Sequence, residues 1–302
     1  MFRSLFLYLS RNKKLQEFLL RLPGAQRLAS QFVAGATLAQ AVAATRNLNR
    51  QGMLATLDHL GENVRTREEA AAARDAYREI LAEISTQQLQ STISVKLTQL
   101  GLDLSEADCQ ANLEAVVQQA QRLGNFVEVD MESSAYTDQT LAAIRQLRRS
   151  YSAVGAVIQA YLYRSEEDVQ KLAAERIQVR LCKGAYKEPS SLAFPHKTDV
   201  DENFLRLMRI LLSSGTYHSI ATHDPRMIEQ TCRYARQLAL SQNNFEFQML
   251  YGVRRDLQTH LVQEEYRLRI YIPFGKEWFP YFMRRLAERP ANVLFVLKAL
   301  VR

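Results

Sequence analysis

Hydrophobic positions follow two alternating patterns from residue 52 onward. Short apolar runs predict strands, and a longer run with the three- and four-residue spacing of an amphipathic helix follows each of them. The predicted strands are 53–57, 92–97, 126–130, 156–161, 177–182, 219–222, 245–250 and 268–272. The predicted helices are 67–89, 106–123, 138–149, 166–174, 198–213, 225–240, 253–264 and 277–288.

Eight strand–helix units over about 240 residues predict an α/β fold, a (βα)8 TIM-type barrel with extra N-terminal helices. The structural alternative is an open doubly wound sheet, which normally carries a glycine-rich turn after one of its strands. The chain contains 11 glycines, and no two of them form Gly-x-Gly. We therefore prefer the barrel, with residues 1–50 as an N-terminal helical arm and residues 51–302 as the barrel.

Capping residues mark three of the predicted helices. Ser105 and Ser165 each precede acidic residues of a first turn, and Pro225 follows Asp224. Serine and aspartate are preferred N-caps, and proline is favoured in the first turn. These positions support helices that begin near residues 106, 166 and 225.

The N-terminal segment 1–22 has an amphipathic helical pattern with basic residues. Its apolar stretch is too short to span a membrane and lacks the features of a secretory signal. Two interpretations stay open: docking on a membrane surface, and packing on the protein's own body. The apolar segment 292–301 is a second candidate for membrane contact.

Composition narrows the classes of protein to consider. Hydrophobic residues make up 47% and charged residues 24%, as in globular proteins. Three scattered cysteines predict no disulfide framework and fit a reducing, cytoplasmic compartment. The net charge of +7 suits nucleic acid, an anionic membrane or an anionic substrate. Because the basic residues form no long run, we expect no nucleic-acid partner.

Polar residues recur at the C-terminal ends of the predicted strands, although barrel strands are covered on both faces and should be apolar. In a (βα)8 barrel these ends form the catalytic face, so the pattern predicts an active site there. The residues are Asp58, Glu62, Lys96, Asp130, Glu132, Gln159, Arg180, Lys183, Thr222, His223, Gln248 and Tyr271.

The residue types in the sequence argue against some catalytic chemistries and leave others open. No histidine pair has metal-ligand spacing, so we expect no metal, and no Gly-x-Ser-x-Gly nucleophile elbow occurs. A Schiff-base lysine at Lys96 or Lys183, as in an aldolase, stays open. A flavin site also stays open, because it needs polar groups along its chain and a cation near its ring. The strand ends hold such groups in Gln159, Arg180, Lys183, Gly184, Thr222 and His223.

The pair Arg284-Arg285 lies in the last predicted helix. Consecutive helix residues diverge by about 100° around the axis, so both side chains reach one pocket only if that helix crosses the barrel mouth. Two guanidinium groups there would clamp a small carboxylate. The alternative is a solvated arginine pair.

Eight runs of residues together resemble the proline dehydrogenase family, in its short monofunctional bacterial type. They are SVKLTQLGL (94–102), VEVDMES (127–133), VIQAYLYRS (157–165), VRLCKGAYKE (179–188), ATHD (221–224), FEFQMLYG (245–252), RIYIPFG (269–275) and YFMRRL (281–286). The resemblance implies a distorted (βα)8 barrel with C-terminal helices over its catalytic face. It also implies bound FAD, oxidation of L-proline to 1-pyrroline-5-carboxylate, and a membrane quinone as electron acceptor. A cytoplasmic enzyme with peripheral contact to the inner face of the cell membrane fits these implications.

The resemblance also implies roles for the substrate pocket. Asp130 and Arg180 would be the catalytic residues, with Arg180 at the reactive edge of the flavin, and Glu62 would be a gate residue that pairs with an arginine when substrate is bound. The implied substrate-binding residues are Lys96, Tyr186, Leu250, Tyr271, Arg284 and Arg285.

A second set of positions would hold FAD by the same resemblance. These are Met131, Gln159, Arg180, Lys183, Gly184, Ala185, Thr222 and His223. Three positions depart from patterns in the wider family: Ser133 replaces an acidic residue, Lys187 a tryptophan, and Pro195 a flavin-contacting threonine. The first forty residues carry no family motif.

Overall fold

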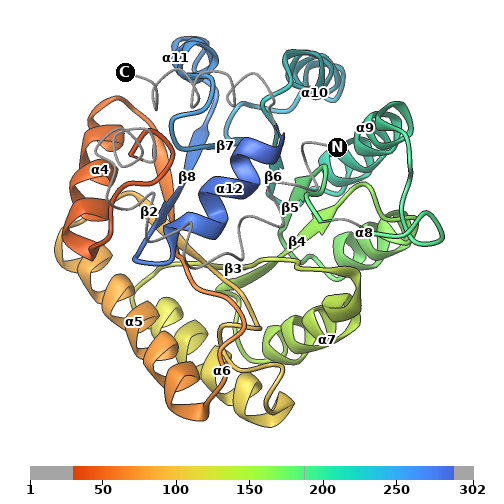
Figure 1. The fold of residues 1–302 in the computed structure, drawn as a ribbon. Coiled ribbons are helices and arrows are strands. Elements are labelled where there is room, and N and C mark those ends of the chain that lie inside the picture. The colour runs from red at the N-terminus through yellow and green to blue at the C-terminus, as the bar shows by residue number, and fades with distance from the viewer. Residues whose placement is uncertain (1–29, 187, 289–302) are drawn as a thin grey trace, which may run out of the picture.

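A computed structural model describes residues 30–186 and 188–288, with side chains to residue 283 at the C-terminal end. Its eight parallel strands close into a barrel in sequence order, from β1 beside β2 around to β8 beside β1 (Figure 1). The predicted barrel is confirmed. The strands are β1 (Leu54–His59), β2 (Ser91–Val95), β3 (Val127–Val129), β4 (Val154–Gln159), β5 (Val179–Cys182), β6 (His218–Ala221), β7 (Phe245–Leu250) and β8 (Leu268–Phe274).

Helices surround the sheet, and their bounds differ from the predicted ones by up to three residues. A short 3-10 turn, η1 (Ser134–Tyr136), precedes one of them. The helices are α4 (Leu38–Arg50), α5 (Arg67–Thr86), α6 (Glu106–Arg122), α7 (Thr137–Arg148), α8 (Ser165–Ala174), α9 (Lys197–Ser213), α10 (Pro225–Gln237), α11 (Arg255–Gln263) and α12 (Trp278–Glu288).

The last helix departs from a regular barrel. Helix α12 crosses the mouth of the barrel, whereas α4 lies in the outer ring (Figure 1). Tyr281 of α12 packs with Leu60, which directly follows β1, and with Val33. Helix α4 contacts β1 and β8, the position that the eighth helix of a regular barrel would take. The chain therefore uses a helix from before the first strand to close its outer ring.

Two of the three predicted caps are confirmed. The Ser105 side chain accepts a hydrogen bond from the Asp108 N–H, and Asp224 caps α10 with Pro225 in the first turn. The predicted cap at Ser165 is wrong. Ser165 is the first residue of α8, and its hydroxyl donates to the carbonyl oxygen of Gln159 at 2.5 Å. The buried carbonyl at the end of β4 takes the hydroxyl that would otherwise cap the helix.

The apolar core lies between the sheet and the helices. Leu57, Val95 and Val129 on the strands are fully buried in one cluster with Tyr77 of α5 and Leu113 of α6. The interior of the barrel is polar instead, and it holds the residues described in the next subsection. In the described part of the chain, no helix is long and apolar enough to cross a membrane. The predicted amphipathic segment 1–22 and the apolar segment 292–301 lie outside the described residues.

Candidate active site

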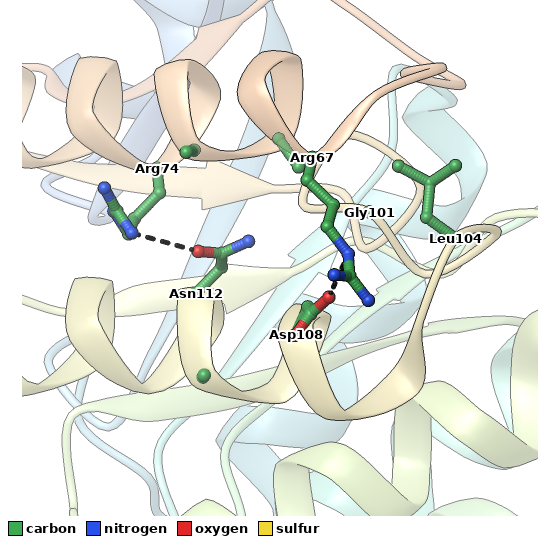
Figure 2. Close-up of a pocket in the computed structure, with 9 residues that line it drawn as sticks. Arg67, Arg74, Gly101, Leu104, Asp108 and Asn112 are labelled. Carbon is green, nitrogen blue, oxygen red and sulfur yellow. Dashed lines mark hydrogen bonds and ion pairs between the residues drawn. The ribbon is translucent and has the colours of Figure 1, made fainter.

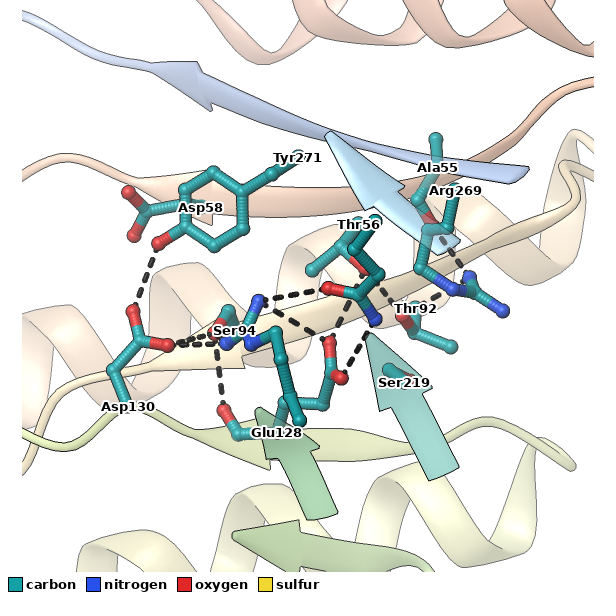
Figure 3. Close-up of polar contacts among 12 residues, drawn as sticks. Ala55, Thr56, Asp58, Thr92, Ser94, Glu128, Asp130, Ser219, Arg269 and Tyr271 are labelled. Carbon is teal, nitrogen blue, oxygen red and sulfur yellow. Dashed lines mark hydrogen bonds and ion pairs between the residues drawn. The ribbon is translucent and has the colours of Figure 1, made fainter. Parts of the chain in front are cut away.

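Polar side chains from every second position of several strands meet inside the barrel (Figure 3). The pairs are Thr56 and Asp58, Ser94 and Lys96, Glu128 and Asp130, Glu246 and Gln248, and Arg269 and Tyr271. Residues two apart on a strand share a face. Hydrogen bonds join strands that are not neighbours, such as β2 to β5 through Ser94 and Arg180, so these side chains point into the interior.

The carboxylate of Asp130 is the centre of the upper part of this network, the part near the C-terminal ends of the strands. Its Oδ2 accepts hydrogen bonds from the Tyr271 hydroxyl at 2.8 Å and from Lys96 Nζ at 3.2 Å. Its Oδ1 accepts from the Ser94 hydroxyl at 2.8 Å and from an Nη2 hydrogen of Arg180. Although burial opposes its charge, Arg180 and Lys96 hold the pKa of Asp130 below its ordinary value. Asp130 is therefore ionised at neutral pH.

Lys96 is buried between two carboxylates, with its Nζ 3.0 Å from Asp58 Oδ1 as well as near Asp130. Burial favours the neutral amine, but Asp58, Tyr271 and Asp130 outweigh it and raise the pKa of Lys96 well above its ordinary value. Burial raises the pKa of Asp58, and Lys96 offsets this only in part. Because a Schiff-base lysine reacts as the neutral amine, this environment disfavours the aldolase alternative at Lys96.

Arg180 is 5% exposed, and its guanidinium lies over the ring of Tyr271, 5.1 Å from the ring centre. Its Nη2 donates to the Ser94 hydroxyl at 2.7 Å, and its Nη1 donates to Gln248 Oε1 at 3.3 Å. Burial works against the charge, but Glu128 and Asp130 raise the pKa of Arg180 above its ordinary value. The site thus contains a permanent buried cation beside the Asp130 cluster.

A second polar layer lies deeper in the barrel. Gln248 Nε2 donates to Glu128 Oε1 at 2.9 Å and to Glu246 Oε1 at 2.8 Å. Arg269 Nε donates to Glu246 at 2.7 Å, and this arginine holds the pKa of Glu246 low despite its burial. Burial raises the pKa of Glu128. Barrel interiors are ordinarily filled by branched apolar side chains, so a charged layer under the site departs from that pattern.

The ends of β4, β5 and β6 carry the residues predicted to hold a cofactor. The buried amide of Gln159 donates to the carbonyl oxygens of Met131 and Glu132 at 3.1 and 2.8 Å, and accepts from the Ala185 N–H at 3.2 Å. Gln159 therefore ties together the ends of β3, β4 and β5.

Lys183 and its neighbours continue this rim. Lys183 Nζ lies 2.5 Å from Asp201 and 2.9 Å from Asp224, and its side chain is 25% exposed. The Thr222 hydroxyl accepts from the Asp224 N–H at 3.1 Å, and His223 Nε2 accepts from the Leu250 N–H at 2.8 Å. These bonds fix the turn after β6 against the ends of β5 and β7.

Gly184 follows β5 with φ +113°, a backbone conformation that only glycine adopts readily. A Cβ at this position would overlap the ring of Tyr161, which follows β4. The sequence suggests that Gly184 allows the backbone to approach a cofactor closely, and the structure adds a tyrosine ring as a second reason for glycine.

The remaining predicted residues are distributed as follows. Leu250 ends β7 and is half-buried, Tyr186 packs against the core cluster, and Glu62 lies in the loop after β1. Arg284 and Arg285 lie on α12. This helix crosses the barrel mouth, which is the condition for a two-arginine clamp, and the arginine side chains lie outside the described residues.

No cluster of metal ligands occurs among the residues that the structure describes. His218 begins β6 and His223 follows its end, and each accepts a backbone hydrogen bond. A surface groove of about 320 Å³ lies between α5 and α6, where Arg67 pairs with Asp108 at 2.9 Å (Figure 2). This groove is on the outer wall of the barrel, separate from the interior network.

Part of the network does not stand out in the sequence as a site. The polar strand ends include Asp58 and Gln248 without assigning them a role, and they do not include Ser94, Glu128, Glu246 and Arg269. A signal for them is present, because each stands two residues from another polar position on the same strand. Such spacing in strands that are covered on both faces indicates a polar barrel interior.

The fold defines a (βα)8 barrel, and its ion-paired cluster at the C-terminal ends of the strands is the candidate active site. The family described as proline dehydrogenase matches residues 41–298. The chain is 43% identical over 302 residues to proline dehydrogenase 1 of Bacillus subtilis (strain 168), covering 100% of both chains. It is 38% identical to proline dehydrogenase of Deinococcus radiodurans, covering 91% of this chain and 90% of the relative.

A solved structure has the same fold. Proline utilization A from Bdellovibrio bacteriovorus, inactivated by N-propargylglycine, superimposes with a TM-score of 0.84 at 24% identity, covering 95% of this chain and 36% of that one. The chain belongs to the proline dehydrogenase family. It oxidises proline, the first step of proline catabolism, and its family is flavin-dependent.

Proposed function

We propose that the chain oxidises L-proline to 1-pyrroline-5-carboxylate with FAD as its cofactor and passes the electrons to a membrane quinone. One observation carries the proposal. Asp130 bonds Lys96 and Tyr271 through one carboxylate oxygen and Arg180 through the other. A cluster suited to an amino acid is thereby joined to a cation suited to a reduced flavin.

The substrate's carboxylate pairs with Lys96, Arg284 and Arg285 in this proposal. Tyr271 and Asp130 line the pocket, Leu250 and Tyr186 pack on the proline ring, and Glu62 is the gate residue. Charged, bidentate partners at the end of proline that does not react act by positioning. The high pKa of Lys96 supports its part, because the ammonium form is the one that binds a carboxylate.

The residues present fit a flavin. Arg180 supplies a buried permanent cation, and Lys183 a partly exposed cation at the rim, suited to a phosphate. Gln159, Met131, Gly184, Ala185, Thr222 and His223 offer amide, backbone and ring groups on adjoining strand ends. We assign these residues, with Arg180, to FAD binding.

FAD, when bound, supplies a two-electron acceptor for the hydride that leaves C5 of proline. Loss of this hydride and of the proton on the ring nitrogen gives the imine of 1-pyrroline-5-carboxylate. Arg180 stabilises negative charge as it develops in the transition state, because its guanidinium is already fixed and desolvated. Asp130 keeps Arg180 and Lys96 apart and oriented.

The acceptor sets the location in this proposal. A quinone lies in the bilayer, so a cytoplasmic enzyme that makes peripheral contact with the inner face of the membrane is the arrangement that we propose. Segments 1–22 and 292–301 are the proposed contacts. Co-sedimentation with anionic liposomes, with and without residues 1–22, tests the first of them.

The absorption spectrum tests the central proposal. Purified protein should show a flavin spectrum that L-proline bleaches in the absence of oxygen. A colourless protein that FAD cannot reconstitute would overturn the proposal. Borohydride treatment with proline present should trap no adduct on Lys96 or Lys183, and a trapped adduct would favour the aldolase alternative.

A further inference from the structure

We propose that Gln248 is a positioning residue for Arg180 in the oxidation of proline. This inference rests on the proposed function, in which Arg180 is the cation at the flavin. Gln248 lies on β7 and is 2% exposed. It joins the deeper polar layer to the upper one, and it acts through Arg180.

The neighbours of Gln248 determine which way its amide points. Its Nε2 lies between two carboxylate oxygens, 2.9 Å from Glu128 Oε1 and 2.8 Å from Glu246 Oε1. Carboxylates accept hydrogen bonds, so the NH2 end of the amide must face them. The Oε1 end then faces Arg180 Nη1 at 3.3 Å, and a flipped amide would set an NH2 group against the guanidinium.

The two ends of the Arg180 guanidinium are held unequally. Nη2 has the Ser94 hydroxyl at 2.7 Å and the Asp130 carboxylate. Nη1 has Gln248 at 3.3 Å and the Glu128 carboxylate at 3.5 Å. Without Gln248, Nη1 keeps only the longer contact with Glu128, which allows the plane of the guanidinium to tilt about Nη2.

A neutral amide is suited to this position because it adds no charge to the layer. Glu246 adds to the burial that raises the pKa of Glu128, and Arg269 compensates Glu246 through a 2.7 Å hydrogen bond. Gln248 gives each carboxylate a donor and gives Arg180 an acceptor, while the positive charge of Arg180 stays available to the site.

The experiment compares Gln248→Met with a matched control, Tyr217→Phe. Tyr217 donates to Glu246 Oε2 at 2.9 Å, so the control removes a hydrogen bond from the same deep layer without touching Arg180. Arg180→Met serves as the reference for complete loss of the cation. We measure the flavin reduction potential, the rate of anaerobic reduction by L-proline, and KM, all on FAD-loaded enzyme.

Gln248→Met should slow flavin reduction at least about tenfold and shift the potential in the negative direction, as Arg180→Met does, because a misplaced cation stabilises the reduced flavin less. Tyr217→Phe should leave the rate of flavin reduction within about twofold of the wild-type rate and the reduction potential unshifted. If Gln248→Met behaves like Tyr217→Phe while Arg180→Met shifts the potential, the inference is wrong and the proposed function stands. If Arg180→Met leaves the potential unchanged, the role of Arg180 in the proposed function is wrong.

A second variant covers the case in which Gln248→Met does not fold. Gln248→Asn keeps an amide in the layer but withdraws it by one methylene from Nη1. It should shift the potential in the same negative direction as Arg180→Met, by a smaller amount. An unshifted potential in folded Gln248→Asn would overturn the inference.

Discussion

The Tyr271 hydroxyl donates a 2.8 Å hydrogen bond to Oδ2 of Asp130, while the Tyr271 ring lies under the Arg180 guanidinium, 5.1 Å from it. Arg180 also bonds the other oxygen of the same carboxylate. One tyrosine thus contacts both charged groups, and its hydroxyl and its ring are separable by substitution.

Tyr271→Phe removes the hydroxyl and keeps the ring. Loss of a hydrogen bond to a charged group costs about 1.5–3 kcal/mol, so we expect kcat/KM for proline to fall at least about tenfold. Tyr271→Leu also removes the contact of the ring with Arg180, so kcat/KM should fall further in this variant. Steady-state kinetics on both variants checks this, and equal losses would mean that the ring contributes nothing.

The two aspartates around Lys96 should differ in their effect on stability. Asp130→Asn leaves two buried cations short of a partner, which costs about 3–5 kcal/mol. Asp58→Asn should cost clearly less, because burial already raises the pKa of Asp58 and so disfavours its charged form. Urea unfolding gives both values, and a larger loss in Asp58→Asn would contradict the expected order.

His218 should make the protein less stable in mild acid. Burial lowers its pKa to about 4, and its Nδ1 accepts a hydrogen bond from the Val179 N–H. As pH falls from about 6.5 to 4, the unfolded chain takes up a proton that the folded chain does not, so stability falls by about 3 kcal/mol.

His218→Asn should remove this contribution, since an amide oxygen can accept the same N–H bond without titrating. The measurement is the slope of unfolding free energy against pH between 4 and 6.5, which should be shallower in the variant. Parallel curves for wild type and His218→Asn would refute the assignment.

Gly184→Ala should destabilise the turn after β5. Its φ of +113° is unfavourable for alanine, and the new Cβ would overlap the Tyr161 ring. We expect the free energy of unfolding to fall by at least about 1–3 kcal/mol and the flavin content to fall with it. Gly215→Ala is the control, because its φ is +73° and a Cβ there meets nothing within 4 Å. Thermal unfolding should show the larger loss in Gly184→Ala.

Arg285→Met tests the proposed carboxylate clamp. If Arg285 binds the proline carboxylate, KM for proline should rise at least about tenfold while flavin content stays near that of wild type. Kinetics together with the flavin-to-protein absorbance ratio separates the two effects. Loss of flavin with an unchanged KM would show that Arg285 belongs to the cofactor site instead.

Much of this protein is predictable from local patterns. The alternation of strands and helices is set by periodicity that nearby residues impose, so all eight strands were found near their observed bounds. The polar strand ends marked Lys96, Asp130, Arg180 and Tyr271 as site residues, because charges are rare in strands covered on both faces. The family motifs added the substrate class.

Other features depend on how distant segments meet. Periodicity alone cannot distinguish α12 in the outer ring from α12 across the mouth, because an amphipathic helix can pack in either place. The family resemblance implies the second placement, and the contacts of Tyr281 with Leu60 and Val33 decide it. The partners of Gln248 likewise come from β3, β5 and β7, and only closure of the barrel brings these strands around one interior. Burying each charged residue would be costly in free energy if its own strand were considered alone. The closed barrel offsets this cost by supplying a partner from another strand.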